Sequence, residues 1–302
     1  MRHIYLEQIS KTERKINAIK SKYKVGKPNG VLESYSRLPF FKIHRFFLEA
    51  DGRVIYYGDE GRCFLKMQDV GLYFYLNMIA TENGVDSFSR VQLFNSDEIR
   101  NSIKDLLSKS SGDSRASKTI RDSFMRLKAA ELIECDIDNS TSIESYHNIK
   151  IPHKHNTYKT KGFFRFYYVD IQKAIEKIKD GMIDLSTRDF LNLLGVYTVS
   201  SLIFYNEHGS NYLGNGIVTV DSFSVSRYAN RIDFTFGLKL TGGVRKKGVK
   251  EYMDILEELG LMVSMGVNSK MYENRFTLYT FPKNIGQFYK IIEDIYEQMG
   301  EE

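Results

Sequence analysis

The chain has 302 residues, of which 42% are hydrophobic and 27% charged, and its net charge is +5. This length suits two domains with a short extension, and the ordinary composition with only four prolines argues against extended disorder. The apolar stretches are shorter than the roughly 20 residues that span a bilayer, and the N-terminus lacks the apolar core of a secretory signal, so we expect a cytoplasmic protein.

Basic charge is concentrated in two segments. Residues 1–28 carry eight basic and two acidic residues, a net +6 that exceeds the charge of the whole chain. Residues 150–161 contain no acidic residue but four lysines, which are Lys150, Lys154, Lys159 and Lys161. Such clusters suit a polyanion, because neutralising phosphates releases counterions. Solvated surface charge is the alternative for either segment.

The first predicted elements are an arm and a hairpin. Residues 4–23 have the spacing of a weakly amphipathic helix, followed by a cluster of glycine and proline, so we expect residues 1–30 to form a basic N-terminal helical arm and linker. Residues 40–47 and 53–57 are rich in aromatic and β-branched residues around a turn-like Asp51-Gly52. They predict a β-hairpin that leads into the first domain.

Residues 31–150 are expected to form a first winged helix-turn-helix domain. In chain order its predicted elements are a helix after Asp69 with one buried face, a strand over 85–94, a helix over 99–107, a helix that begins at Ser114, a strand over 132–137 and a turn over 139–142. The helix that begins at Ser114 should bury Ile120, Phe124, Leu127 and Ala130. Helix, strand, helix, turn, basic helix, strand and loop is the order of a winged helix.

A connector over 151–182 and a second winged-helix domain over 183–302 are expected to follow. The connector should contain a strand over 163–170 and a helix over 171–180. The second domain should contain a helix over 190–205 capped by residues 186–189, a strand over 216–220, helices over 224–232 and 244–259, strands over 261–265 and 276–281 around a wing at 266–270, and a closing helix over 284–299. Gly260 is expected to end the helix before it. Residues 233–243 exceed the usual turn of three to four residues, so an insertion or another pairing is the alternative there.

The two basic helices supply the candidate DNA-binding residues of this α+β fold. Their first turns contain Arg115, Ser117, Lys118 and Arg121 in the first domain, and Arg245, Lys246, Lys247 and Lys250 in the second. In the major groove Arg and Lys pair with guanine, and Ser or Asn contact other base edges. The basic loop, with Lys154, Lys159 and Lys161, would follow phosphates or enter the minor groove. A solvated helix face, an interdomain linker for the loop, and a winged helix that binds only protein are the alternatives.

Patterns of catalysis and metal binding are incomplete in this sequence. His153 and His155 are too few ligands for a closed zinc site, and Lys154 between them breaks the His-hydrophobic-His pattern of nicking nucleases. Residues 243–249 resemble a P-loop in glycine spacing but lack its Lys-Ser/Thr pair. Cys63 and Cys135 have no C-x-x-C partner and predict neither a zinc ribbon nor a disulfide. We therefore expect no enzyme activity, no cofactor and no bound metal.

The chain is rich in aromatic residues, with twenty tyrosines and twenty phenylalanines. Residues 163–168 include several of them and suggest two roles. They would stack on exposed bases, as in single-strand binders, or pack at an interface between the two units or in a dimer. We favour packing.

Residues 114–132 with Ile133-Glu134 after them, and residues 244–260 with Leu261-Met262 after them, resemble plasmid replication initiators built from tandem winged helices. The resemblance implies sequence-specific binding of double-stranded DNA at repeated origin sites, in initiation of plasmid or phage replication. It also implies a monomer or homodimer that recruits host replication proteins. A transcriptional regulator at an operator and a non-catalytic interaction module in a replication or partition assembly are the alternative functions.

Overall fold

The computed structural model describes residues 35, 37–44, 55–58, 61–82, 91–95, 103, 114–137, 146–151, 163–204, 218–221, 248–268, 275–286 and 288–290. The chain forms two compact units, each assembled from separate segments. Unit 1 comprises Met1–Leu38, Ile203–Ser222 and Gly260–Glu302, and unit 2 comprises Pro39–Leu202 and Phe223–Leu259. The domain boundaries given above divide the chain by sequence instead, and they stay a prediction.

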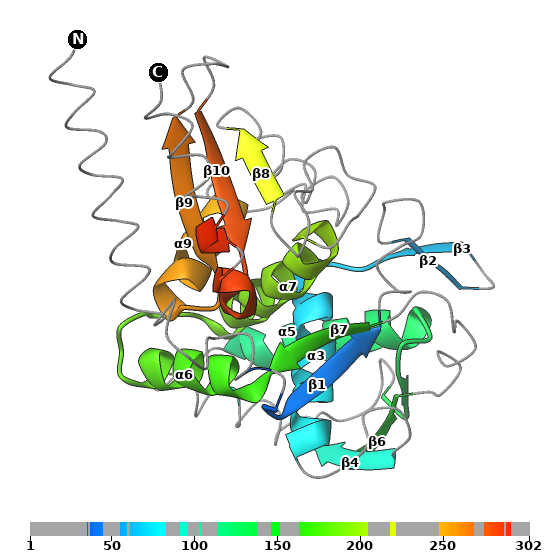
Figure 1. Ribbon diagram of the computed structural model, residues 1–302. Helices are drawn as coiled ribbons and strands as arrows, with labels where there is room; N and C mark the ends of the chain where they lie inside the picture. The colour runs from blue at the N-terminus through cyan, green and yellow to red at the C-terminus, as the bar shows by residue number, and fades with distance from the viewer. Residues whose placement is uncertain are drawn as a thin grey trace, which may run out of the picture. The chain divides into compact units, whose positions relative to one another are not determined.

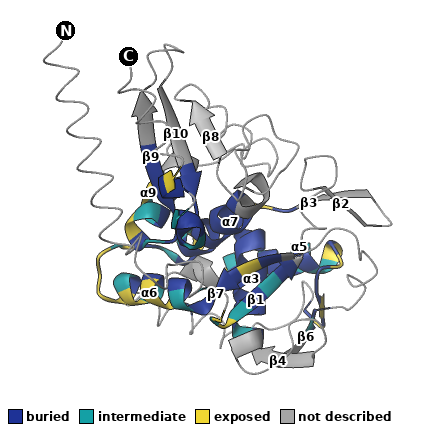
Figure 2. Ribbon diagram, in the orientation of Figure 1, coloured by how far each residue is buried: buried dark blue, intermediate teal, exposed yellow. Residues whose placement is uncertain are grey.

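Helix α3 (Met67–Glu82) is the centre of unit 2 (Figure 1). It is buried on every side from Met67 to Met78, and Figure 2 shows dark blue at its upper part, where the strands in front leave it visible. The predicted helix is therefore confirmed, but the expectation of one buried face is wrong. A helix that is hydrophobic all round belongs inside a core, and α3 packs against both strand β1 and helix α5.

Strand β1 (Phe40–His44) pairs antiparallel with β7 (Phe163–Tyr167), which lies beside it in Figure 1 although the two are far apart in sequence. Strand β2 (Ile55–Gly58) instead pairs with β3 (Gly61–Phe64). The predicted hairpin between residues 40–47 and 53–57 is thus wrong. The turn-like Asp51-Gly52 favoured a local pairing, whereas burial of the β1 and β7 aromatic side chains on α3 determines the partner.

The inner face of the β1–β7 pair forms an aromatic cluster with α3 and helix α7 (Thr187–Phe204). The ring of Phe74 on α3 lies 4.9 Å from the rings of both Phe41 and Phe166 and 5.8 Å from that of Tyr197 on α7. Offset and edge-on ring pairs at these distances stabilise a core beyond their buried area. Phe164 and Phe166 are buried in this cluster, so they do not provide exposed rings for stacking on bases. The aromatic segment packs as favoured above, but within one unit.

Helices α3 and α7 approach each other at two glycines. A Cβ on Gly71 would lie 1.8 Å from the carbonyl oxygen of Leu191, and one on Gly195 would lie 2.2 Å from that of Met67. Real Cβ contacts are essentially never shorter than 3.0 Å, so only glycine fits at either position.

Helix α5 (Ser114–Ala129) precedes a three-stranded antiparallel sheet of β4 (Val91–Asn95), β5 (Glu134–Cys135) and β6 (Tyr146–Lys150). The order in the sheet is β4-β6-β5, so the last strand lies in the middle. β4, α5 and β5 correspond to predicted elements, whereas β6 was not predicted. The predicted helix over 99–107 lies outside the described residues except for Ile103, which is helical and fully buried.

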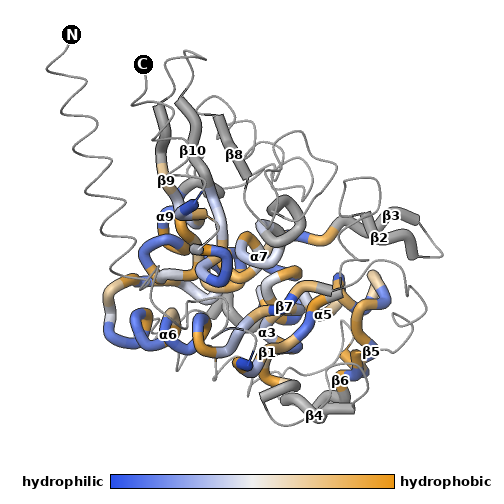
Figure 3. The backbone as a smooth tube through the Cα atoms, in the orientation of Figure 1, coloured by the Kyte–Doolittle hydropathy of each residue, from blue (hydrophilic) through white to orange (hydrophobic). Residues whose placement is uncertain are grey.

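Helix α6 (Tyr168–Lys179) and helix α9 (Gly248–Leu259) complete unit 2 and pack against each other. Figure 3 shows α6 alternating between hydrophilic and hydrophobic residues, and its buried Ile171, Ala174 and Ile178 recur at helical spacing. It begins at Tyr168, so the predicted strand over 163–170 ends three residues early. The Nζ of Lys177 on α6 donates a hydrogen bond of 2.7 Å to the carbonyl oxygen of Glu258 near the end of α9.

Unit 1 contains a second three-stranded antiparallel sheet and a short 3-10 helix, η3 (Pro282–Asn284). Its strands are β8 (Val218–Asp221), β9 (Val263–Asn268) and β10 (Arg275–Thr280), in the order β8-β10-β9. The predicted strands are confirmed, although β9 continues through residues 266–268, which were assigned to the wing. The predicted helix over 224–232 lies outside the described residues, as do residues 291–299 of the closing helix.

The chain therefore repeats one order of elements. In the first repeat α3, β4, α5, β5 and β6 follow each other, and in the second α7, β8, α9, β9 and β10 do. Both sheets place the last strand between the other two. The described part of the chain mixes helices with small antiparallel sheets, which is compatible with the predicted α+β class.

Candidate nucleic-acid interface

Helix α5 has one apolar face and one polar face. Ile120, Phe124 and Leu127 recur at helical spacing and are at most 1% exposed, as predicted, and Ala130 directly after the helix is also buried. On the opposite side Lys118 and Ala129 are exposed, with Asp122 and Met125 half-buried between them. The apolar face anchors the helix, and on the opposite side the helix is exposed at Lys118 and Ala129.

The N-terminal half of α5 contains the four candidates of the first domain. Arg115 and Ser117 belong to its first turns, Lys118 is exposed, and Arg121 is half-buried with its Nε enclosed by the protein. The first turn has no acidic residue. Because the N-terminus of a helix carries partial positive charge, basic side chains there add to a field that attracts anions.

The C-terminal end of α5 is closed by a left-handed residue that is not glycine. Glu131 has a φ of 54°, its N–H donates to the carbonyl of Lys128, and the N–H of Leu132 donates to that of Leu127. These two bonds define a Schellman motif, in which the residue after the helix usually is glycine. Leu127 and Leu132 are both fully buried, which supplies the apolar contact of the motif.

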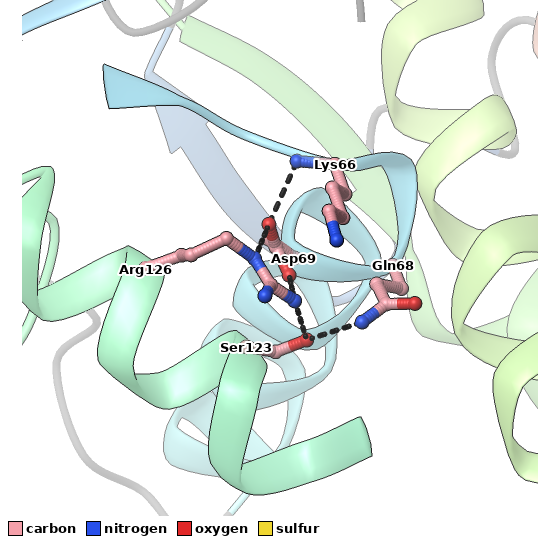
Figure 4. A network of polar contacts seen from close by, with 5 residues as sticks. All are labelled: Lys66, Gln68, Asp69, Ser123 and Arg126. Atoms are coloured by element: carbon pink, nitrogen blue, oxygen red, sulfur yellow. Dashed lines mark hydrogen bonds and ion pairs between the residues drawn. The ribbon is translucent and has the colours of Figure 1, made fainter. Parts of the chain in front are cut away.

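A polar network joins α5 to the start of α3 (Figure 4). The Nε and Nη2 of Arg126 donate to Oδ2 and Oδ1 of Asp69 at 2.7 and 2.8 Å. The N–H of Lys66 donates to Oδ2 of Asp69 at 2.7 Å, which caps α3. The Oγ of Ser123 accepts from Nε2 of Gln68 at 3.2 Å and from Nη2 of Arg126 at 3.4 Å. Asp69 is fully buried, so its carboxylate is satisfied by α5 and by its own cap.

Two lysines connect the first sheet to its surroundings. Lys128 on α5 donates a 3.0 Å hydrogen bond to the carbonyl of Ile137, just beyond β5. Lys150, the first lysine of the predicted basic loop, is the last residue of β6 and forms a 3.2 Å ion pair with Glu134 directly opposite on β5. Both side chains of that pair are largely exposed, so it contributes little to stability.

Helix α9 differs from α5 in charge. Its helical spacing predicts Val249, Met253, Leu256 and Leu259 as buried; Met253, Leu256 and Leu259 are buried, the burial of Val249 is not described, and Tyr252 is buried as well. The acidic residues of α9 number four, namely Glu251, Asp254, Glu257 and Glu258, against the single Lys250. In α5 five basic residues face one acidic residue. Gly260 follows α9 with a φ of 80°, which confirms its predicted role as the residue that ends the helix.

Several predicted DNA-binding residues lie outside the described part of the chain. They are Arg245, Lys246 and Lys247 before α9, and Lys154, Lys159 and Lys161 of the basic loop. Lys250 belongs to the first turn of α9. Of the predicted residues, the structure thus brings Arg115, Ser117, Lys118 and Arg121 together on one helix.

A second polar cluster joins α7 and α9 around Asp189. The hydroxyl of Tyr252 donates to Oδ1 of Asp189 at 2.8 Å and accepts from Nδ2 of Asn192 at 3.2 Å. Burial raises the pKa of the Tyr252 phenol well above its ordinary value. At the start of α7, the Oγ of Ser186 donates to Oδ2 of Asp189 and accepts from its N–H, which confirms residues 186–189 as the predicted cap.

Sequence reasoning missed Asp69, Arg126 and Tyr252 as partners across helices. Asp69 was used only to mark a helix start, and Arg126 lies 57 residues away. No spacing rule links residues at that separation. The capping position of Asp69 was the one available signal, because a carboxylate at a buried helix start needs donors beyond its own turn.

In the described residues we find no group of three or more His, Cys, Asp and Glu side chains arranged to hold a metal ion. Cys135 is buried, and burial raises the pKa of its thiol. Within the same part of the chain no helix has the length and apolar character needed to cross a membrane. Comparisons with protein-family models, with curated proteins and with solved structures found no match to this chain.

Proposed function

We propose that the chain binds double-stranded DNA as a tandem winged-helix protein, with α5 as its recognition helix. The observation that carries the proposal is the exposed Lys118 in the basic, acid-free N-terminal half of a helix whose other face is anchored in the core. Base edges in the major groove are read by such a half-helix, while the flanking phosphates attract its charge. The role is non-catalytic, and it implies a cytoplasmic location.

The repeated topology supports this proposal. In a winged helix the recognition helix is the last helix before two strands that form a hairpin, and an earlier strand completes the sheet. α5 precedes β5 and β6, and α9 precedes β9 and β10. In both sheets the earlier strand, β4 or β8, pairs with the last strand. The loops between β5 and β6 and between β9 and β10 would be the wings.

A salt-titrated binding assay with the full chain tests the assignment of α5. The target is duplex DNA from the region flanking the coding sequence, where direct repeats indicate an origin and a palindrome indicates an operator. Lys118→Ala should weaken binding about tenfold and, where Lys118 contacts a phosphate, lower the slope of log affinity against log salt by about 1. The Arg115→Ala/Lys118→Ala pair should weaken it further.

Lys173→Ala is the matched control, because Lys173 is an exposed lysine on α6 in the same unit. It removes the same charge from a helix that is not assigned to DNA. If Lys118→Ala and Lys173→Ala weaken DNA binding equally, the contribution of Lys118 is that of any surface charge, and the assignment of α5 as the recognition helix is wrong. If the parent chain binds no duplex at low salt, the proposal is wrong.

A protein-binding role for the second repeat is the second candidate function. It is favoured by α9, where Glu251, Asp254 and Glu258 are all exposed. Acidic side chains on a recognition helix would repel phosphates. Glu251→Gln/Asp254→Asn should therefore leave DNA affinity and its salt slope unchanged if α9 faces protein. A several-fold gain in affinity would instead indicate that α9 lies close to DNA.

Initiation of plasmid or phage replication is the process we favour, on the resemblance described above. In this role the chain would also bind a second copy of itself, as a homodimer, and host replication proteins. Footprints over several direct repeats would support an initiator, and a single protected palindrome would support a transcriptional regulator.

A further inference from the structure

The two repeats share a polar contact between their first and last helices. Asp69 is the third residue of α3, and Asp189 is the third residue of α7. Each accepts a hydrogen bond from the last helix of its own repeat, Asp69 from Arg126 on α5 and Asp189 from Tyr252 on α9. An aspartate at the same place in both first helices points to a common task.

The geometry of the Asp69–Arg126 pair restricts how α5 can move. Its two parallel hydrogen bonds, at 2.7 and 2.8 Å, fix the plane of the guanidinium against the carboxylate. The carboxylate is itself fixed by the N–H of Lys66, and its side chain is 0% exposed, against 22% for Arg126. An apolar face alone, such as that of Ile120 and Phe124, is less directional because hydrophobic contact depends on area rather than on angle.

Net stability is a poor explanation for a pair of this kind. Removing two charges from water costs several times what an exposed pair gains, and buried pairs are often replaced by apolar residues of similar volume without loss of stability. In some proteins such a pair instead selects one arrangement among several of similar energy. For α5 that arrangement is its angle to α3.

A small change of that angle has a large effect at the DNA-binding end. Lys118 precedes Arg126 by two helical turns, about 12 Å along the axis. A tilt of about 10° around Arg126 would therefore move the backbone at Lys118 by about 2 Å. Hydrogen bonds to base edges do not tolerate such a displacement, whereas attraction to phosphates does.

We propose that Asp69 and Arg126 are positioning residues that set the angle of α5, and that Asp189 and Tyr252 do the same for α9. The consequence for DNA rests on the proposed function. The consequence for helix geometry does not. The second repeat replaces the guanidinium by a phenol, whose single 2.8 Å hydrogen bond is supported by Asn192. The position of the aspartate is thus common to both repeats, and the charge of its partner is not.

Three variants of the full chain test the first pair. Asp69→Leu/Arg126→Met replaces it by apolar side chains, Arg126→Lys keeps the charge but removes the planar fork, and Tyr168→Phe is the control. Tyr168 donates a buried 2.9 Å hydrogen bond to the carbonyl of Met78 on α3, so its loss affects α3 without α5. Each variant is measured for melting temperature and for affinity to specific and nonspecific duplex DNA.

Helix angle is measured separately by pulsed electron paramagnetic resonance. Spin labels at Lys118→Cys on α5 and Gln172→Cys on α6, both exposed positions in unit 2, report the angle as a distance distribution. Cys63 and Cys135 are replaced by Ala for this purpose. DNA binding is measured on unlabelled protein, because the label removes Lys118.

Both α5 variants should broaden or shift the distance distribution by about 2 Å or more, as estimated from the helix rise. The ratio of specific to nonspecific affinity should fall about tenfold, with nonspecific binding retained at low salt. The double variant should melt within a few degrees of the parent, and Tyr168→Phe should leave distances and specificity unchanged.

An unchanged distance distribution in Arg126→Lys, which keeps the charge and is the variant expected to fold in any case, would overturn the positioning role. If Arg126→Lys broadens the distance distribution but the parent chain binds no DNA, the positioning role stands and the proposed function is wrong. An equal broadening in Tyr168→Phe would show that any buried bond to α3 has this effect, and would overturn the proposal as well.

Discussion

Gly71→Ala tests the closest approach in the core of unit 2. The added Cβ would lie 1.8 Å from the oxygen and 2.7 Å from the carbon of the Leu191 carbonyl, and 3.0 Å from the nitrogen of Gly195. An acceptable contact begins near 3.0 Å, so the oxygen must move by at least 1.2 Å. These atoms belong to the backbone of α7, and no side-chain rotation relieves the overlap. The two helices must separate.

Two effects of opposite sign determine the change in the free energy of unfolding. Alanine is better than glycine in a helix by about 1 kcal/mol. Overpacking of a core costs about 1–3 kcal/mol, and a backbone clash belongs at or above the upper end of that range. Separation of α3 from α7 would also weaken the ring contact of Phe74 with Tyr197. We expect a net loss of about 2 kcal/mol, or roughly 4–8 °C in melting temperature for a unit of this size.

Thermal melts followed by circular dichroism measure the loss. Gly195→Ala should behave alike, because its Cβ would lie 2.2 Å from the carbonyl oxygen of Met67. The double variant should lose less than the sum of the two, since one separation of the helices relieves both overlaps. Ala129→Gly, at the exposed last residue of α5, tests helix propensity without an overlap and should cost less than about 1 kcal/mol, because the full cost applies to helix interiors. A Gly71→Ala protein that melts at or above the parent temperature would refute contact between α3 and α7 at this point.

Three further substitutions address other features of unit 2. Glu131→Gly should raise the free energy of unfolding by about 1 kcal/mol in urea titrations, because glycine adopts the φ of 54° without strain; a loss would argue against the Schellman end of α5. The raised pKa of Tyr252 means that the folded protein holds a proton which the unfolded chain releases near pH 10, so stability is complete below that pH and falls above it by up to about 1.4 kcal/mol per pH unit. Tyr252→Phe should reduce this alkaline slope, and an identical slope in both proteins would contradict the burial of the phenol. Phe74→Ala should cost about 3–5 kcal/mol by the same titration, since its ring touches three others, and a loss below about 1 kcal/mol would exclude Phe74 from the core.

Helices with one apolar face were predictable from the sequence. The spacing of Ile120, Phe124 and Leu127 identified the buried side of α5, and the strands β9 and β10 were predicted from their residue types. Such patterns are local, because a helix or strand that borders solvent on one side must separate polar from apolar residues within a few positions. α3 does not border solvent, so its sequence has no polar side and its predicted single buried face was wrong.

Pairings between distant segments could not be predicted. β1 was assigned to a local hairpin because Asp51-Gly52 is typical of a turn, but its partner β7 begins more than a hundred residues later. β6 was missed because Tyr146–Lys150 offers little alternation, with Ile149 as its buried apolar residue. Backbone hydrogen bonds to β4 and β5 hold it in the sheet. Because these bonds do not depend on the side chains, the residue types of β6 do not reveal them. The contact of Asp69 with Arg126 follows from the packing of α3 on α5 and not from either helix alone.

The two repeats agree in the order of their elements but differ in the charge of their last helices. Both have the same order of elements and the same order of strands, so topology alone does not distinguish α5 from α9. Charge does, since α5 has five basic residues and one acidic residue, whereas α9 has one and four. DNA carries one phosphate charge about every 1.7 Å of its axis, and a helix approaching it experiences that field over its whole length. A last helix that keeps its place in the order of elements but reverses its charge is suited to a different partner.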